Sequence, residues 1–93
     1  MLTLIWSDYI KYRIDLRGFN LSKIEEILRF SDERYFDTAT QRMVAVGRHD
    51  KMLVMIPYDI SEKESEKIIT PVTVHATTRQ QIKFRLSSGR FLK

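Results

Sequence analysis

His75 lies in the longest stretch of this chain without an acidic residue. Residues 67–93 contain six Lys or Arg and no Asp or Glu, so they carry a formal charge of +6, whereas residues 1–66 carry −2. Arg79 follows His75 by four residues, and Lys83 follows Arg79 by four. An imidazole titrates near neutral pH, and a guanidinium can bind an anion through two hydrogen bonds. This spacing predicts a positive surface on which a polyanion binds and reacts.

Further basic residues extend the predicted site. Arg85 continues the basic face of the last helix and Arg90 follows that helix, so we expect both to bind nucleic acid together with Arg79 and Lys83. Arg48 lies in a polar turn between two apolar segments. If that turn folds toward the last helix, Arg48 reaches the same phosphate group.

Each of these residues also has an ordinary structural explanation. His75 at the end of a strand can hydrogen-bond the cap of the next helix, and the basic residues can form a solvated helix face. The pair His49-Asp50 resembles part of a metal site. The chain has two histidines and no cysteine, so we expect no metal site and no cofactor.

The composition is that of one small globular domain, which we expect to span residues 1–93. Ninety-three residues, 43% of them hydrophobic, suffice for one modest core. No apolar run approaches the roughly 20 residues that span a bilayer, and the first residues lack the pattern of a signal peptide. We therefore expect a cytoplasmic protein without a membrane partner. A pI of about 9.6 predicts an acidic partner, nucleic acid first and an acidic protein second.

Capping residues predict where three helices begin. Gly18 is suited to end the first helix, and Glu25 follows a candidate cap by three residues, as in a capping box. In the last helix, Gln80 and Gln81 stand at the reciprocal positions. The expected caps are Ser7 or Asp8, Ser22, and Thr77 or Thr78.

The pattern from Glu33 onward is that of β-strands. The polar residues 59–67 predict a solvated hairpin loop, and Pro71 predicts an edge position or a bulge. Residues 87–91 predict a short flexible tail that contacts RNA or docks on the domain. After an opening strand at residues 2–6, the expected strands cover residues 35–36, 43–46, 52–56 and 68–75.

This order of elements predicts an α+β fold. Two N-terminal helices and a C-terminal helix would pack on one face of a four-stranded antiparallel sheet. The expected core residues are Ile24, Ile27, Leu28, Tyr35, Val44, Val46, Leu53, Met55 and Val72.

Three segments resemble those of a known protein family. Residues 17–22, Arg-Gly-Phe-Asn-Leu-Ser, open the second helix. Residues 46–48, Val-Gly-Arg, precede a polar turn and the apolar residues 53–56. Residues 72–76 run into Thr-Thr-Arg-Gln at 77–80. These segments are similar to the Arg-Gly turn, the central hairpin and the final strand with its basic helix in the RelE/ParE superfamily of bacterial toxins, nearest its BrnT-like branch.

Two positions depart from that family pattern. Gln80, Gln81 and Ile82 dilute the arginine cluster usual in the last helix, and His75 stands where the related toxins often have an arginine. The resemblance implies a RelE-like fold but does not transfer a complete catalytic set.

The resemblance implies the toxin of a type II toxin–antitoxin system, a metal-independent endoribonuclease that cleaves mRNA, often on the ribosome, and inhibits translation. Its partner would be a cognate antitoxin, covering the positive face with an acidic segment. The chemistry needs a group that transfers protons and cations that stabilise a charged phosphorane. The expected catalytic residues are His75, Arg79, Lys83 and Arg48. Two alternatives stay open: a non-catalytic RNA- or protein-binding module of the same fold, and an interaction domain with no nucleic-acid role.

Overall fold

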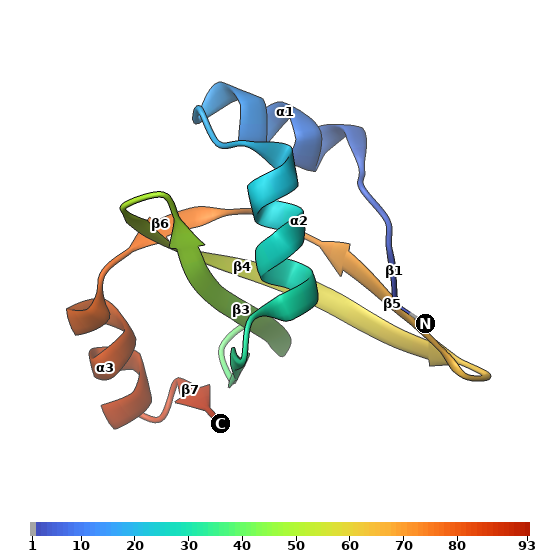
Figure 1. Ribbon diagram of the computed structural model, residues 1–93. Helices are drawn as coiled ribbons and strands as arrows, with labels where there is room; N and C mark the ends of the chain where they lie inside the picture. Colours follow the sequence, from blue (N-terminus) through green and yellow to red (C-terminus); the bar gives the residue numbers. More distant parts are fainter. Residues whose placement is uncertain (1) are drawn as a thin grey trace.

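Figure 1 shows the computed structural model, which describes residues 2–93. The predicted α+β class is confirmed, and the described residues form three helices. In chain order the elements are β1 (Leu2–Leu4), α1 (Asp8–Leu16), α2 (Leu21–Phe30), β2 (Glu33–Asp37), β3 (Arg42–His49), β4 (Met52–Lys63), β5 (Glu66–Pro71), β6 (His75–Thr77), α3 (Arg79–Ser87) and β7 (Phe91–Leu92).

Within residues 2–93, seven strands form one mixed sheet. Their order is β1-β5-β4-β3-β2-β7, and β6 pairs with β4 outside this path. β1 runs parallel to β5, with Leu2 opposite Lys67, while the other pairs are antiparallel. The predicted four-stranded, purely antiparallel sheet is therefore wrong. β1, β6 and β7 are two or three residues long, too short to show an alternating pattern, and pairing between distant segments leaves no local signal.

The polar residues 59–67 are not a loop, which corrects the prediction. β4 continues to Lys63, and β5 begins at Glu66 after a turn in which Glu64 has φ +60°. Figure 1 shows this hairpin extending away from the helices. Both strands are solvent-exposed here, so their side chains stay polar while the backbone hydrogen bonds between the strands persist.

The predicted strand at residues 68–75 is divided into β5 and β6. Pro71 ends β5 opposite Tyr58 of β4, and β1 pairs with β5 only as far as Ile69. Pro71 therefore lies where β5 has a neighbour on one side, which confirms the predicted edge position. Residues 72–74 then carry the chain to β6.

The helix caps are short polar side chains at all three starts. Ser7 caps α1 and Thr78 caps α3, each within the predicted pair of candidates. The cap of α2 is Asn20, whose Oδ1 accepts a hydrogen bond from the Lys23 amide at 3.2 Å. The predicted cap at Ser22 is therefore wrong, because asparagine two residues earlier fills the same role.

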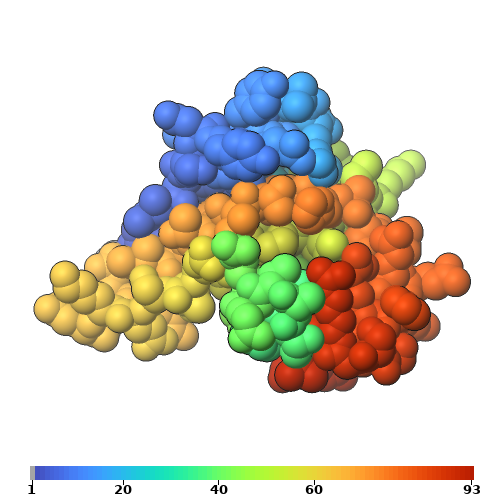
Figure 2. Space-filling view, turned by 180° about the vertical axis from the view of Figure 1, so that it is seen from behind, coloured from blue at the N-terminus to red at the C-terminus, as the bar shows by residue number. Residues whose placement is uncertain are grey.

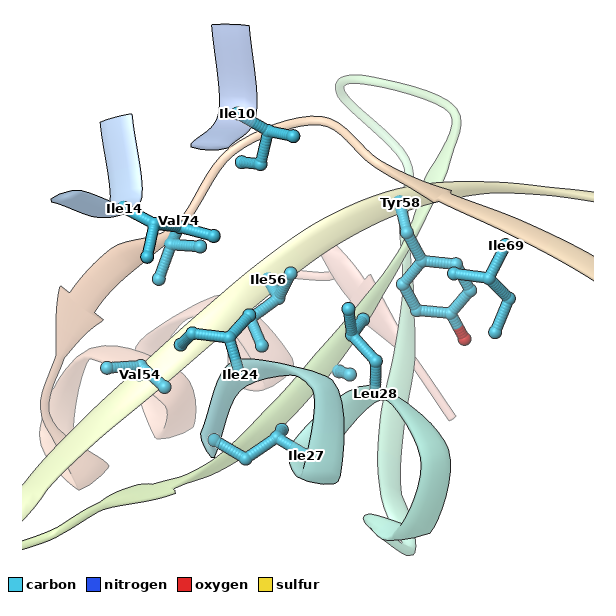
Figure 3. Close-up of a cluster of buried hydrophobic side chains, with 11 residues drawn as sticks. Ile10, Ile14, Ile24, Ile27, Leu28, Val54, Ile56, Tyr58, Ile69 and Val74 are labelled. Atoms are coloured by element: carbon cyan, nitrogen blue, oxygen red, sulfur yellow. The ribbon is translucent and has the colours of Figure 1, made fainter. Parts of the chain in front are cut away.

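The larger core cluster lies between the sheet and helices α1 and α2 (Figure 3). α2 approaches β3 closely at Gly47, where a Cβ atom would lie 2.8 Å from Cγ2 of Ile27. A larger residue at position 47 would force the Ile27 side chain or α2 to move. The buried members of the cluster are Ile10, Ile14, Ile24, Ile27, Leu28, Ala45, Val54, Ile56, Tyr58, Ile69 and Val74.

α3 covers the opposite face of the sheet, where a second cluster forms. Along β3, Val44 and Val46 belong to this cluster, whereas Ala45 between them belongs to the first, because successive strand residues point to opposite faces. The prediction that all three helices share one face is therefore wrong. The buried members of the second cluster are Tyr35, Val44, Val46, Leu53, Ile82 and Phe91.

The predicted tail is docked on the domain as β7. Phe91 is buried, pairs in register with Asp37 of β2, and stacks on the ring of Tyr35 with centroids 5.4 Å apart. All the expected core residues are buried except Met55 and Val72, which are half-buried.

Candidate active site

His75 opens β6 and lines a pocket on the α3 face of the sheet. It stands opposite Met55 of β4, and its side chain is half-buried. The pocket has a volume of about 150 Å³. In Figure 2 its walls meet in the middle of the view: the turn after β2 in green, the chain around residues 72–75 in orange and the C-terminal residues in red. The polar residues that line it are Asp37, Thr40, Arg42, Thr73, His75 and Arg90.

The imidazole of His75 favours its neutral form. Burial lowers its pKa below the ordinary value of about 6.5, and the positive charges of Arg17, Arg13 and Arg85 lower the pKa further. A neutral imidazole near pH 7 is able to accept a proton. The protein therefore holds a potential general base within the field of several cations.

Three arginines supply that field from two helices. Arg17 caps the C-terminus of α1 and donates a hydrogen bond from Nη1 to the carbonyl oxygen of Val74 at 3.0 Å, which ties α1 to the residue before His75. The Nε atoms of Arg13 and Arg85 are buried, and no residue from 2 to 93 accepts a hydrogen bond from either. Their guanidinium groups lie over aromatic rings, that of Arg13 over Tyr9 at 5.9 Å and that of Arg85 over Phe91 at 5.7 Å, and both positive charges act on His75.

The turn after α3 brings a further arginine to the pocket. Gly89 has φ +81°, a conformation that favours glycine, and it reverses the chain into β7. Arg90 then donates from Nε and Nη2 to the two carboxylate oxygens of Asp37, at 3.1 and 3.2 Å. Burial alone would raise the pKa of Asp37, but hydrogen bonds from Arg90 and from the Ala39 amide hold the pKa below its usual range. Asp37 thus stays ionised and fixes Arg90 at the pocket.

Arg42 is the second pocket arginine with an acidic partner. Its Nε lies 3.1 Å from Oδ1 of Asp59 in β4, and both side chains are substantially exposed. An exposed pair of this kind is weak, at about 0–1 kcal/mol. Arg42 can therefore exchange this partner for a phosphate at low cost.

The predicted phosphate ligand Arg79 has an acidic partner too. It is the first residue of α3, and its Nη1 donates to Oε2 of Glu33 at 2.6 Å, while the hydroxyl of Tyr35 donates to the same oxygen at 2.7 Å. Burial alone would raise the pKa of Glu33, but the hydrogen bonds from Arg79 and Tyr35 and the charge of Arg79 bring the pKa below its usual range. Arg79 is therefore largely neutralised where it stands.

Two other predicted residues stand apart from His75. Lys83 is exposed on α3 and does not line the pocket of His75. Arg48 lies near the end of β3 and lines a different pocket, together with Lys23 and Asp50. The structure thus brings Arg85 and Arg90 together with His75, and places Arg79, Lys83 and Arg48 elsewhere.

The second histidine has a structural role. His49 is buried, and its Nε2 accepts a hydrogen bond from the Asn20 amide at 2.8 Å. Its ring meets Phe19 edge-on, with centroids 5.2 Å apart. Within residues 2–93 no group of three or more His, Cys, Asp or Glu is placed to hold a metal ion.

Sequence reasoning missed the arginines that come from outside the acid-free stretch. Arg13 and Arg17 are four residues apart, so one face of a helix carries both. That spacing was the available signal, but only the packing of α1 shows that this face lies toward His75. Arg42 sits at the start of a strand and carries no comparable signal.

A comparison with protein-family models finds no match to this chain, and neither does a comparison with curated proteins. No helix in the described part of the chain is long and apolar enough to cross a membrane.

Proposed function

We propose that this chain is an endoribonuclease that cleaves single-stranded RNA without a metal ion, as the toxin of a toxin–antitoxin pair that inhibits translation. The RelE-like and BrnT-like resemblance suggested this activity, and the surroundings of His75 are what support it in three dimensions. A cognate antitoxin with an acidic segment would neutralise the positive surface.

The supporting observation is a neutral imidazole among guanidinium groups. His75 favours the deprotonated form, the guanidinium group of Arg85 lies over the ring of Phe91, which lines the same pocket, and Arg90 is fixed there by Asp37. A phosphodiester suits both features, because its cleavage needs a base beside it and positive charge around it.

The reaction would be a transesterification within one nucleotide. His75 takes the proton of a 2′-hydroxyl, and that oxygen forms a bond to the adjacent phosphorus. The bond from phosphorus to the 5′-oxygen breaks, and that oxygen takes a proton from solvent. The arginines stabilise the negative charge that builds up on the phosphorus oxygens. The products are a 2′,3′-cyclic phosphate and a free 5′-hydroxyl.

The test is to incubate purified protein with a long mRNA, alone in the presence of EDTA and separately with ribosomes in a magnesium buffer, because ribosomes dissociate without Mg²⁺. We expect cleavage that EDTA does not inhibit and product ends that carry a cyclic phosphate. Expression of the chain without a neutralising partner should also arrest growth. Intact RNA under both conditions, or cleavage of free RNA that stops when EDTA is added, would contradict the proposal.

The second candidate is a non-catalytic module that binds RNA or a protein through the same surface. The observation in its favour is that Arg79, Arg90 and Arg42 already have carboxylate partners. Less free positive charge is then available to stabilise a transition state. RNA binding without cleavage, and growth without arrest, would favour this candidate.

A further inference from the structure

A second groove runs along α3 and has an exposed aromatic ring in its wall. Phe84 is 70% exposed, and the groove has a volume of about 590 Å³. Its other walls include Gln80, Gln81, Arg85 and Arg90, and among residues 2–93 no acidic residue lines it. The ring of Phe84 therefore presents an apolar surface to solvent beside two guanidinium groups.

This groove adjoins the pocket of His75. Arg90 lines both of them, and Arg85, which lies in the groove, also lowers the pKa of His75. A ligand bound at His75 can therefore continue past Arg90 into the groove along α3.

The chemistry of the lining selects the ligand class. An aromatic ring stacks on any nucleobase, and arginines next to it bind the phosphates on either side. All the residues that line the groove belong to residues 67–93, which contain no Asp or Glu. The groove therefore does not attract a basic partner. The side-chain amide of Gln80, a donor and an acceptor at once, suits the edge of a base.

We propose that the groove along α3 is a nucleotide subsite, in which one base of single-stranded RNA stacks on Phe84 while Arg85 and Arg90 hold its phosphates. This inference rests on the proposed function, because it names the part of the RNA substrate that lies beside the cleaved bond.

Phe30 is a matched control for Phe84. It is 73% exposed, also on a helix, but it lies on α2 beside the carboxylate of Glu26 and outside the groove along α3. Both rings are surface residues, so alanine at either position should leave the fold intact. Circular dichroism and thermal melting of each variant would verify this.

The experiment measures binding of a fluorescent single-stranded RNA of about 12 nucleotides, 2′-O-methylated throughout so that it cannot react. We expect Phe84→Ala to weaken binding by about 5- to 100-fold, which corresponds to the loss of one stacked base. Phe84→Leu should weaken it to a similar degree, and Phe84→Trp should bind at least as tightly as the wild-type protein. Phe30→Ala should bind like the wild-type protein.

Equal affinities for Phe84→Ala and Phe30→Ala would overturn the subsite, and so would full binding by Phe84→Leu, since leucine fills an apolar groove but cannot stack. Cleavage is measured separately on unmodified RNA. Cleavage together with unchanged binding by Phe84→Ala would leave the nuclease proposal standing and remove the subsite. If binding depended on Phe84 but no RNA were cleaved, the subsite would stand and the nuclease proposal would fall.

Discussion

His75 owes its chemical character to its neighbours. The same imidazole at an exposed strand end would titrate near its ordinary pKa of about 6.5. Here burial and the charges of Arg13, Arg17 and Arg85 lower the pKa. The sequence identified the residue, since only two histidines are present and one lies in the acid-free stretch. It could not identify the cause of the shift, because Arg13 and Arg17 come from α1 and its C-terminal cap, roughly 60 positions earlier in the chain.

The lowered pKa of His75 makes stability depend on pH in a defined direction. The unfolded chain binds a proton at this residue more readily than the folded protein, so stability is present at neutral pH and is lost as pH falls through the ordinary pKa toward the lowered one. We expect the free energy of unfolding to fall less between pH 7.5 and pH 5 in His75→Gln than in the wild-type protein. Urea unfolding at both pH values measures this.

The other titrating groups are present in both proteins of that comparison. Glu33, Asp37 and Asp50 also have lowered pKa values and lose their stabilising effect as pH falls, but this loss is common to the two and cancels in the difference. An identical pH dependence in wild-type protein and His75→Gln would contradict the description of the His75 environment.

At the scale of elements, features set by local sequence were predicted better than features set by pairing between distant segments. Caps at Ser7 and Thr78 act within one helical turn, so the sequence around them was sufficient. Ser22 fits the same local pattern, but the prediction that it caps α2 is wrong, because Asn20 provides an earlier cap. The division of helices between the two sheet faces depends on which residues of β3 face α3, and no single segment contains that information.

β7 shows most clearly that amino-acid composition alone does not predict whether a segment is ordered. A short segment containing Ser, Gly and Arg has the composition of a flexible tail. The segment is nevertheless part of the fold, because the side chain of Phe91 packs against Tyr35 and α3 in the second core cluster. The docking of β7 also positions Arg90 at the pocket, so the element matters for the site as well as for the core.

We expect Phe91→Ala to lower the free energy of unfolding by about 3–5 kcal/mol, the usual loss for a buried phenylalanine. The neighbouring residue Leu92 is 48% exposed, so Leu92→Ala is the matched control and should cost much less. Chemical denaturation of the two variants measures both values. Equal, small losses would mean that β7 does not belong to the folded core.

At the scale of the whole molecule, the charge distribution predicted a basic surface but not which charges are free. Residues 67–93 contribute the entire positive excess. In three dimensions Glu33 neutralises Arg79 and Asp37 engages Arg90, while Arg13 and Arg17 add charge from α1. Formal charge along the sequence therefore overstates the contribution of Arg79 and omits that of α1.

This difference can be measured through the salt dependence of RNA binding. Each phosphate contact with single-stranded RNA contributes about 0.7 to the slope of log K against log salt. We expect Arg85→Gln to reduce the slope by up to about that amount, and Arg79→Gln to reduce it less because Glu33 already neutralises that charge. A larger reduction in Arg79→Gln than in Arg85→Gln would favour the arrangement predicted from sequence alone.

The most direct test of the proposed function compares the rate of RNA cleavage by wild-type protein, His75→Ala and Lys63→Ala, all in EDTA. Lys63 ends β4 in the exposed hairpin and serves as a control for loss of a surface charge. We predict that His75→Ala cleaves about 100- to 10,000-fold more slowly, the usual contribution of a general base, while Lys63→Ala cleaves like the wild-type protein. Cleavage by a folded His75→Ala at the wild-type rate would contradict the central claim that His75 carries the proton transfer.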